Sequence, residues 1–172
     1  MMMLTLACIG EPEDTGDPIE DTLPDAWIEY YRADSLISAG GFEFEEEYLV
    51  RRFMDPPAET ILEEFVATAD GTLTEVEFLV DADAGTFELH FSDDSYEGTG
   101  NLYGEAWAWT SWDSHSVATD GGWVDSEDTM TQGAIHAEKT GFSAEGEQEW
   151  TLVEDLAPLT EEQWTEATAE LP

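Results

Sequence analysis

The segment FEFEEEYLVRRF, residues 42–53, alternates apolar and charged side chains with a period of two. Phe42, Phe44, Tyr48 and Val50 share one parity, and glutamates fill most of the other parity in the first half of the segment. Successive side chains of a β-strand point to opposite faces, whereas a helix repeats every 3.6 residues. The segment therefore predicts a strand with one face toward a core and one face toward water.

The same period of two continues along most of the chain. Turn-forming sequences interrupt it, such as Asp55-Pro56-Pro57, Asp70-Gly71 and Asp120-Gly121-Gly122. Residues 27–33 fit either a first strand or a helical turn, and the periodicity leaves both open. About eight strands are expected, and those after residues 42–53 cover about residues 59–68, 74–81, 87–91, 102–112, 123–139 and 143–154.

A helix is predicted at the C-terminal end of the chain. Thr160 has the character of an N-cap, Gln163 completes a capping box, and Leu159 and Trp164 stand where a hydrophobic staple would form. The apolar stripe of this helix consists of Trp164, Ala167 and Leu171. We expect the helix to dock on the sheet or to close one end of a barrel.

Sequential antiparallel strands of this kind bury one face most simply by closing into an up-and-down barrel, which also removes exposed edges. We therefore predict an all-β, antiparallel up-and-down barrel of about eight strands with a C-terminal helix. The strand order, the glycines of Gly98-Thr99-Gly100 and Tyr103-Gly104 before a Trp-rich strand, and the final helix resemble a calycin-type barrel, the group that includes lipocalins. The resemblance covers about residues 27–172. A β-sandwich is the alternative, because the GxW of lipocalins is absent near Trp27.

The N-terminal sequence MMMLTLAC resembles the end of a bacterial lipoprotein signal peptide. Leu4, Leu6 and Ala7 precede Cys8, and the resemblance implies that Cys8 is lipidated and becomes the mature N-terminus. It also implies a location at the cell envelope, in the outer membrane or at the cell surface. Residues 9–25 are acidic and rich in turn formers, which predicts a disordered tether. We thus divide the chain into a signal-peptide remnant (1–8), a tether (9–25) and one barrel domain (26–172).

Charge limits the partners that the protein can bind. The chain has 42 acidic and 4 basic side chains, a formal net charge of −38. A field of this sign repels phosphate backbones and anionic lipids, which excludes nucleic acid as a partner and leaves a lipid anchor as the means of contact with a membrane. A single cysteine makes no internal disulfide. We expect a monomer.

The predicted barrel interior is the candidate ligand site. An eight-stranded barrel is just wide enough to be packed solid or to hold one small ligand. Arg52 shares the inward parity of Val50, so it would either bind the carboxylate of a ligand or pair with a carboxylate of the protein. The expected ligand is a small apolar or amphipathic molecule, and the candidate inner wall consists of Tyr48, Arg52, Phe78, Phe91, Tyr103, Trp107 and Trp109.

Signals for catalysis and for metal binding are weak. His90, His115 and His136 lack the spacing of a zinc site, and the loop from Asp81 to Gly85 departs from the calcium-binding pattern. The nucleophile motif GxSxG does not occur. We therefore assign no catalytic residue, metal ligand or cofactor. Two alternatives stay open: an enzyme that acts on a hydrophobic or carbohydrate substrate through paired carboxylates, and a non-catalytic surface module that contacts other proteins.

Overall fold

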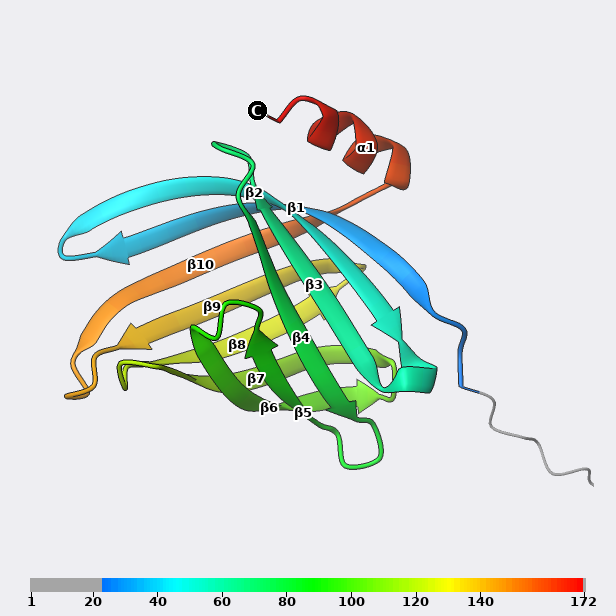
Figure 1. Cartoon of the computed structure of the whole chain (residues 1–172), viewed down its shortest axis with the longest axis horizontal. Coiled ribbons are helices and arrows are strands. Elements are labelled where there is room, and N and C mark those ends of the chain that lie inside the picture. The colour runs from blue at the N-terminus through cyan, green and yellow to red at the C-terminus, as the bar shows by residue number, and fades with distance from the viewer. Residues whose placement is uncertain (1–22, 172) are drawn as a thin grey trace, which may run out of the picture.

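The computed structural model describes residues 23–171, so Cys8 and most of the predicted tether lie outside the described residues. The described chain forms a closed antiparallel barrel with a helix at its C-terminal end (Figure 1). Its strands are β1 (Trp27–Ala39), β2 (Phe42–Asp55), β3 (Thr60–Ala67), β4 (Leu73–Asp81), β5 (Thr86–Phe91), β6 (Tyr96–Glu105), β7 (Ala108–Ala118), β8 (Trp123–Thr131), β9 (Ala134–Phe142) and β10 (Gln148–Leu159).

Each strand pairs with the next one in sequence, and β10 pairs with β1 to close the barrel. The prediction of an all-β up-and-down barrel is confirmed, and the β-sandwich alternative is wrong because the strand order is closed. The open choice at residues 27–33 is settled in favour of a strand. The turns alternate between two ends, so the β1–β2, β3–β4, β5–β6, β7–β8 and β9–β10 turns share one end, which we call the open end.

Ten strands form instead of about eight, because two segments predicted as single strands each contain a hairpin. In residues 102–112 the chain reverses after Glu105, with Trp107 at a left-handed φ of 61°. In residues 123–139 it reverses at Gln132 and Gly133, whose φ angles are 53° and 82°. Tight hairpins favour Gly, Asn or Asp at such positive φ, so Trp107 and Gln132 gave no turn signal.

Aromatic side chains fill the end of the barrel opposite to the open end, which we call the closed end. The ring centres of Trp107 and Trp109 are 5.0 Å apart, and Trp27 meets Trp107 edge to face at 6.5 Å. These rings join a buried cluster with Met54 and Ile61. The 3-10 turn η1 (Pro56–Ala58) connects β2 to β3 at the same end.

The β1–β2 hairpin reaches beyond the neighbouring strand β3. β2 pairs with β1 from Phe42 onward, but it pairs with β3 only from Tyr48 onward. As a result Phe42 and Phe44 are 67% and 52% exposed, and the prediction that they face the core is wrong. Phe42 and Phe44 have the parity of the inward residues of β2, but β3 does not extend far enough along β2 to cover them.

The helix α1 (Glu161–Ala169) begins with the predicted capping box. Gln163 N donates to Thr160 Oγ1 at 3.2 Å, and Thr160 N donates to Gln163 Oε1 at 2.8 Å. Trp164 packs on Tyr30 with ring centres 5.5 Å apart, and Tyr30 alternates with the inward residue Tyr31. The helix therefore docks on the outer wall and does not close an end (Figure 1). Within residues 23–171, no helix has the length and hydropathy that a bilayer span requires.

Candidate functional site

The barrel encloses a cavity of about 230 Å³ to which every strand contributes side chains. A dry cavity of about 150 Å³ holds benzene, so by proportion this one holds a molecule of roughly ten non-hydrogen atoms. Most of its wall is apolar, including Val50, Phe65, Phe78, Leu89, Phe91 and Trp112. The inward parity of each strand places these side chains here, as the alternating pattern requires.

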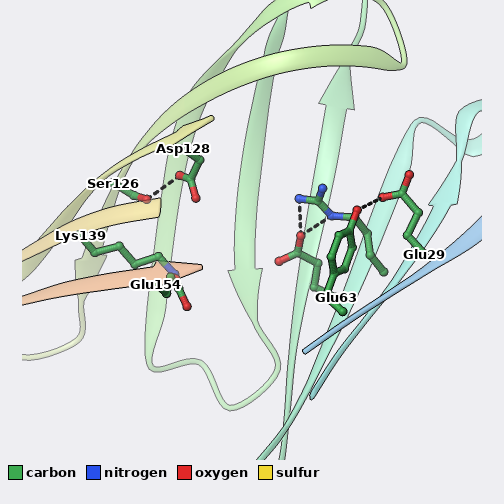
Figure 2. A network of polar contacts seen from close by, with 8 residues as sticks. Glu29, Glu63, Ser126, Asp128, Lys139 and Glu154 are labelled. Carbon is green, nitrogen blue, oxygen red and sulfur yellow. Dashed lines mark hydrogen bonds and ion pairs between the residues drawn. The ribbon is translucent and has the colours of Figure 1, made fainter. Parts of the chain in front are cut away.

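Eight side chains form an inner polar cluster in and beside this apolar wall, and Figure 2 shows them in two groups. The first group contains Glu29, Tyr31, Arg52 and Glu63. The second group contains Ser126, Asp128, Lys139 and Glu154. Charged side chains are seldom buried in a protein interior without a function or a partner. The cluster therefore distinguishes this barrel from a purely packed one.

Arg52 is the centre of the first group. Its Nε donates to Glu63 Oε1 at 2.6 Å, and its guanidinium carbon lies 5.0 Å from the ring centre of Trp112. Tyr31 OH donates to Glu29 Oε2 at 2.8 Å, and burial together with the Glu29 carboxylate raises the pKa of Tyr31. Of the two roles predicted for Arg52, the structure shows pairing with a carboxylate of the protein.

Glu154 is the centre of the second group, and only 2% of it is exposed. Lys139 Nζ contacts Glu154 Oε1 as an ion pair, while Glu154 Oε2 is buried without a hydrogen-bond partner among the described residues. Burial raises the pKa of the Glu154 carboxyl to about 7. Ser126 Oγ donates to Asp128 Oδ2 at 2.6 Å, and burial also raises the pKa of Asp128.

The residues predicted to form the inner wall separate into groups. Arg52, Phe78 and Phe91 line the cavity. Tyr48 lies beside Phe65 at the open end, with ring centres 5.9 Å apart. A further group, Trp107 and Trp109, lines a smaller hollow of about 70 Å³ at the closed end.

Tyr103 does not face the interior, so its assignment to the inner wall is wrong. It is 49% exposed, and its OH donates to Asp113 Oδ2 at 2.5 Å on the outer face. The assignment relied on a shared parity with Trp107 and Trp109. A register shift between Tyr103 and Gly104 and the hairpin turn that follows reverse that parity.

A surface hollow at the open end adjoins the inner cavity. The two share Phe65, Phe91 and Lys139 as lining residues. The rim of the hollow carries four carboxylates, from Glu45, Glu46, Glu47 and Asp70. A small molecule that enters from this end passes an acidic rim before it reaches the apolar wall.

Sequence reasoning missed the buried charges Glu63, Asp128 and Glu154 and the partly buried Lys139. The signal that was present is parity, because each of them interrupts a run of inward side chains. Glu63 stands between Ile61 and Phe65, for example, and all three are at least partly buried.

Other chemical groups lie away from the cavity. His115 Nδ1 is 2.7 Å from Asp125 Oδ1, and His136 Nδ1 is 2.7 Å from Asp155 Oδ1, in both cases with side chains about half exposed or more. Neither histidine lines the inner cavity. In the part of the chain that the structure describes, no group of three or more His, Cys, Asp or Glu side chains is placed to hold a metal ion.

No protein-family model matches this chain, and a search of curated proteins finds no match. The barrel interior is therefore the basis for assigning a function.

Proposed function

We propose that the barrel binds one small apolar or amphipathic molecule in its inner cavity. The observation that carries this proposal is the cavity of about 230 Å³, lined mainly by apolar and aromatic side chains with a few convergent polar groups. Ligand sites in proteins commonly combine these two features, because apolar burial supplies affinity and a few polar groups fix orientation. Long-chain lipids exceed the volume, so the ligand is a short one.

The open end supplies a route of entry. The hollow beneath the β1–β2 hairpin shares Phe65 and Phe91 with the cavity, whereas Trp27, Trp107 and Trp109 occupy the closed end. A ligand would therefore enter and leave past the acidic rim. This arrangement supports reversible binding of the ligand.

We place the protein at the cell envelope, anchored through a lipid on Cys8. The support is the sequence LTLAC followed by the acidic segment 9–25. Mass spectrometry of the protein from its native membrane is expected to show a diacylglyceryl group on Cys8. Cys8→Ser is expected to release the protein from the membrane fraction, and an unmodified Cys8 would contradict the anchor.

Tryptophan fluorescence tests the binding site, because Trp112 and Trp150 line the cavity. Titration with a panel of small aromatic and aliphatic molecules of roughly ten non-hydrogen atoms is expected to change the emission in a saturable way. Ser116 lines the cavity, and Ser116→Phe would fill it. Val117 follows on the same strand and is 45% exposed on the outer face, so Val117→Phe is the matched control. The site is refuted if no molecule binds, or if both variants bind equally well.

A further inference from the structure

We infer that the ligand carries a protonated amine, which Glu154 and Asp128 bind in the inner cavity. This inference rests on the proposed ligand-binding function and narrows it to one chemical class, short apolar molecules with a cationic nitrogen.

The unpartnered oxygen of Glu154 is the first support. Glu154 lines the cavity, is almost fully buried, and leaves Oε2 without a hydrogen-bond partner among residues 23–171. A buried carboxylate oxygen without a donor is costly, and more so than a neutral group. An N–H donor from a ligand would satisfy Oε2. A ligand carboxylate or ether offers no proton for it.

The balance of buried charge is the second support. Arg52 donates a hydrogen bond to Glu63 and lies over the ring of Trp112, and Lys139 forms an ion pair with Glu154. Asp128 accepts from the neutral hydroxyl of Ser126, and among residues 23–171 it forms no ion pair, although the charges of Lys139 and Arg52 act on it from a greater distance. Four carboxylates, counting Glu29, thus face two basic groups in the inner polar cluster. One added cation brings the cavity closer to neutrality.

The strand register places the two carboxylates on either side of a small residue. Asp128 of β8 pairs with Ala137 of β9, and Ala137 pairs with Glu154 of β10. All three side chains are buried and point inward. Adjacent strands are about 4.8 Å apart, so the backbones of Asp128 and Glu154 are separated by about 10 Å. The residue between them in the register is Ala137, and Lys139 follows two residues further along β9. An ammonium group bound at Glu154 Oε2 would lie on this inward face between the two carboxylates, beside the Lys139 ammonium at Oε1.

The acidic residues at the open end are the third support. The hollow there is lined by Glu45, Glu46, Glu47 and Asp70 and by one basic residue, Lys139, and it adjoins the cavity at Phe65 and Phe91. Of the four carboxylates, Glu47 also pairs with Arg32. A cleft in which one sign of charge predominates concentrates ions of the opposite sign and speeds their association. The rim would favour entry of a cation and oppose entry of an anion.

Three probes of one shape and size test the inference: 2-phenylethylamine, 2-phenylethanol and phenylacetate. Their dissociation constants are measured at pH 8 by calorimetry or by tryptophan fluorescence. The amine is expected to bind at least about tenfold more tightly than the alcohol, the effect of a hydrogen bond to a charged group, and phenylacetate is expected to bind most weakly. Equal affinities for amine and alcohol, or the tightest binding by phenylacetate, would overturn the inference.

Glu154→Gln is the decisive variant. This variant is expected to weaken binding of the amine by about tenfold and to leave binding of the alcohol nearly unchanged. Asp155 is the next residue of β10 and is exposed on the outer face, so Asp155→Asn removes the same charge without touching the cavity. Asp128→Asn offers a second test should Glu154→Gln fold poorly. Loss of amine and alcohol binding to the same extent in Glu154→Gln would contradict recognition of the charge.

The proposed function and this inference fail in different ways. Binding of 2-phenylethanol that is blocked by Ser116→Phe, without preference for the amine, retains the cavity as a binding site and refutes amine recognition. Absence of binding for all three probes at millimolar concentration would refute recognition of short amines. A negative result with the wider panel would refute the binding site itself.

Discussion

Arg52 and Glu63 pair inside the barrel, where Arg52 Nε lies 2.6 Å from Glu63 Oε1. The preceding residue of β2 and the following residue of β3, Arg51 and Glu64, form the same kind of pair on the outer wall. Both inner side chains are about nine-tenths buried, whereas in the outer pair the Arg51 side chain is 44% exposed and the Glu64 side chain 16% exposed. Two adjacent Arg–Glu pairs thus differ mainly in their distance from water.

Glu63→Gln is expected to lower the free energy of unfolding by about 3 kcal/mol or more, because it leaves the Arg52 charge buried without its counter-ion. Glu64→Gln is the matched control, and it is expected to cost about 1 kcal/mol or less, since it leaves behind an Arg51 side chain that is 44% exposed and can be solvated. Urea unfolding followed by tryptophan fluorescence measures both. Equal costs for the two variants would show that the Arg52–Glu63 pair is solvated.

The buried carboxyl of Glu154 makes stability depend on pH. Burial raises its pKa from the usual 4.5 to about 7, so between these values the folded protein holds a proton that the unfolded chain has released. The free energy of unfolding therefore falls as pH rises from about 4.5 to about 7 and levels off above it. The full shift corresponds to about 3 kcal/mol, and the Lys139 ammonium at Oε1 reduces this cost.

The measurement is the difference in unfolding free energy between Glu154→Gln and the unchanged protein at pH 5, 6, 7 and 8. The other carboxylates and the histidines are common to both proteins and cancel in this difference. The variant is expected to gain relative stability as pH rises across this window. A difference that is flat, or that has the opposite slope, would show that Lys139 holds Glu154 ionised throughout.

The wall of the barrel was predictable because inward and outward side chains alternate along each strand, and this alternation can be read from the sequence. Val50, Arg52, Phe78 and Phe91 were placed correctly on this ground alone. Tyr103 was not, because parity is counted along the chain and a register shift or a hidden turn resets the count. The turn at Trp107 has no sequence signal, because a bulky side chain rarely adopts the left-handed backbone found there.

The candidate site was less predictable than the wall. Parity alone could have placed Glu63 and Glu154 inside, but it could not identify their partners. Lys139 and Glu154 meet because β9 and β10 pair in one register, and Asp128 joins them across β8 and β9. The contacts among Lys139, Glu154 and Asp128 depend on closure of the barrel and on the alignment of its strands. The local sequence determines neither.

Trp107 is expected to be essential for stability despite its strained backbone. Its φ of 61° favours Asn or Gly, but its ring packs against Trp27 and Trp109 at the closed end. Trp107→Asn relaxes the backbone and removes this packing, for a net loss of about 2–4 kcal/mol. Gln132 has a φ of 53° in an exposed hairpin turn, so Gln132→Asn is expected to be neutral or to stabilise by up to about 1 kcal/mol. Thermal unfolding compares the two, and a neutral Trp107→Asn would show that the closed end does not depend on this ring.

Gly141 and Trp150 face each other across β9 and β10, and the indole lies directly over the glycine. A Cβ added at Gly141 would come within 2.1 Å of Trp150 Cε2, although the backbone of Gly141 is not left-handed. Gly141→Ala must therefore displace an indole that lines the cavity, with an expected loss of about 1–3 kcal/mol and a shift in tryptophan emission. In a Trp150→Leu background the same change has no ring to displace, so it should be neutral or slightly stabilising, as alanine is in a strand. A double-mutant cycle by urea unfolding measures the coupling between the two positions. An equal cost of Gly141→Ala in both backgrounds would mean that the glycine is required by the strand itself and not by the ring.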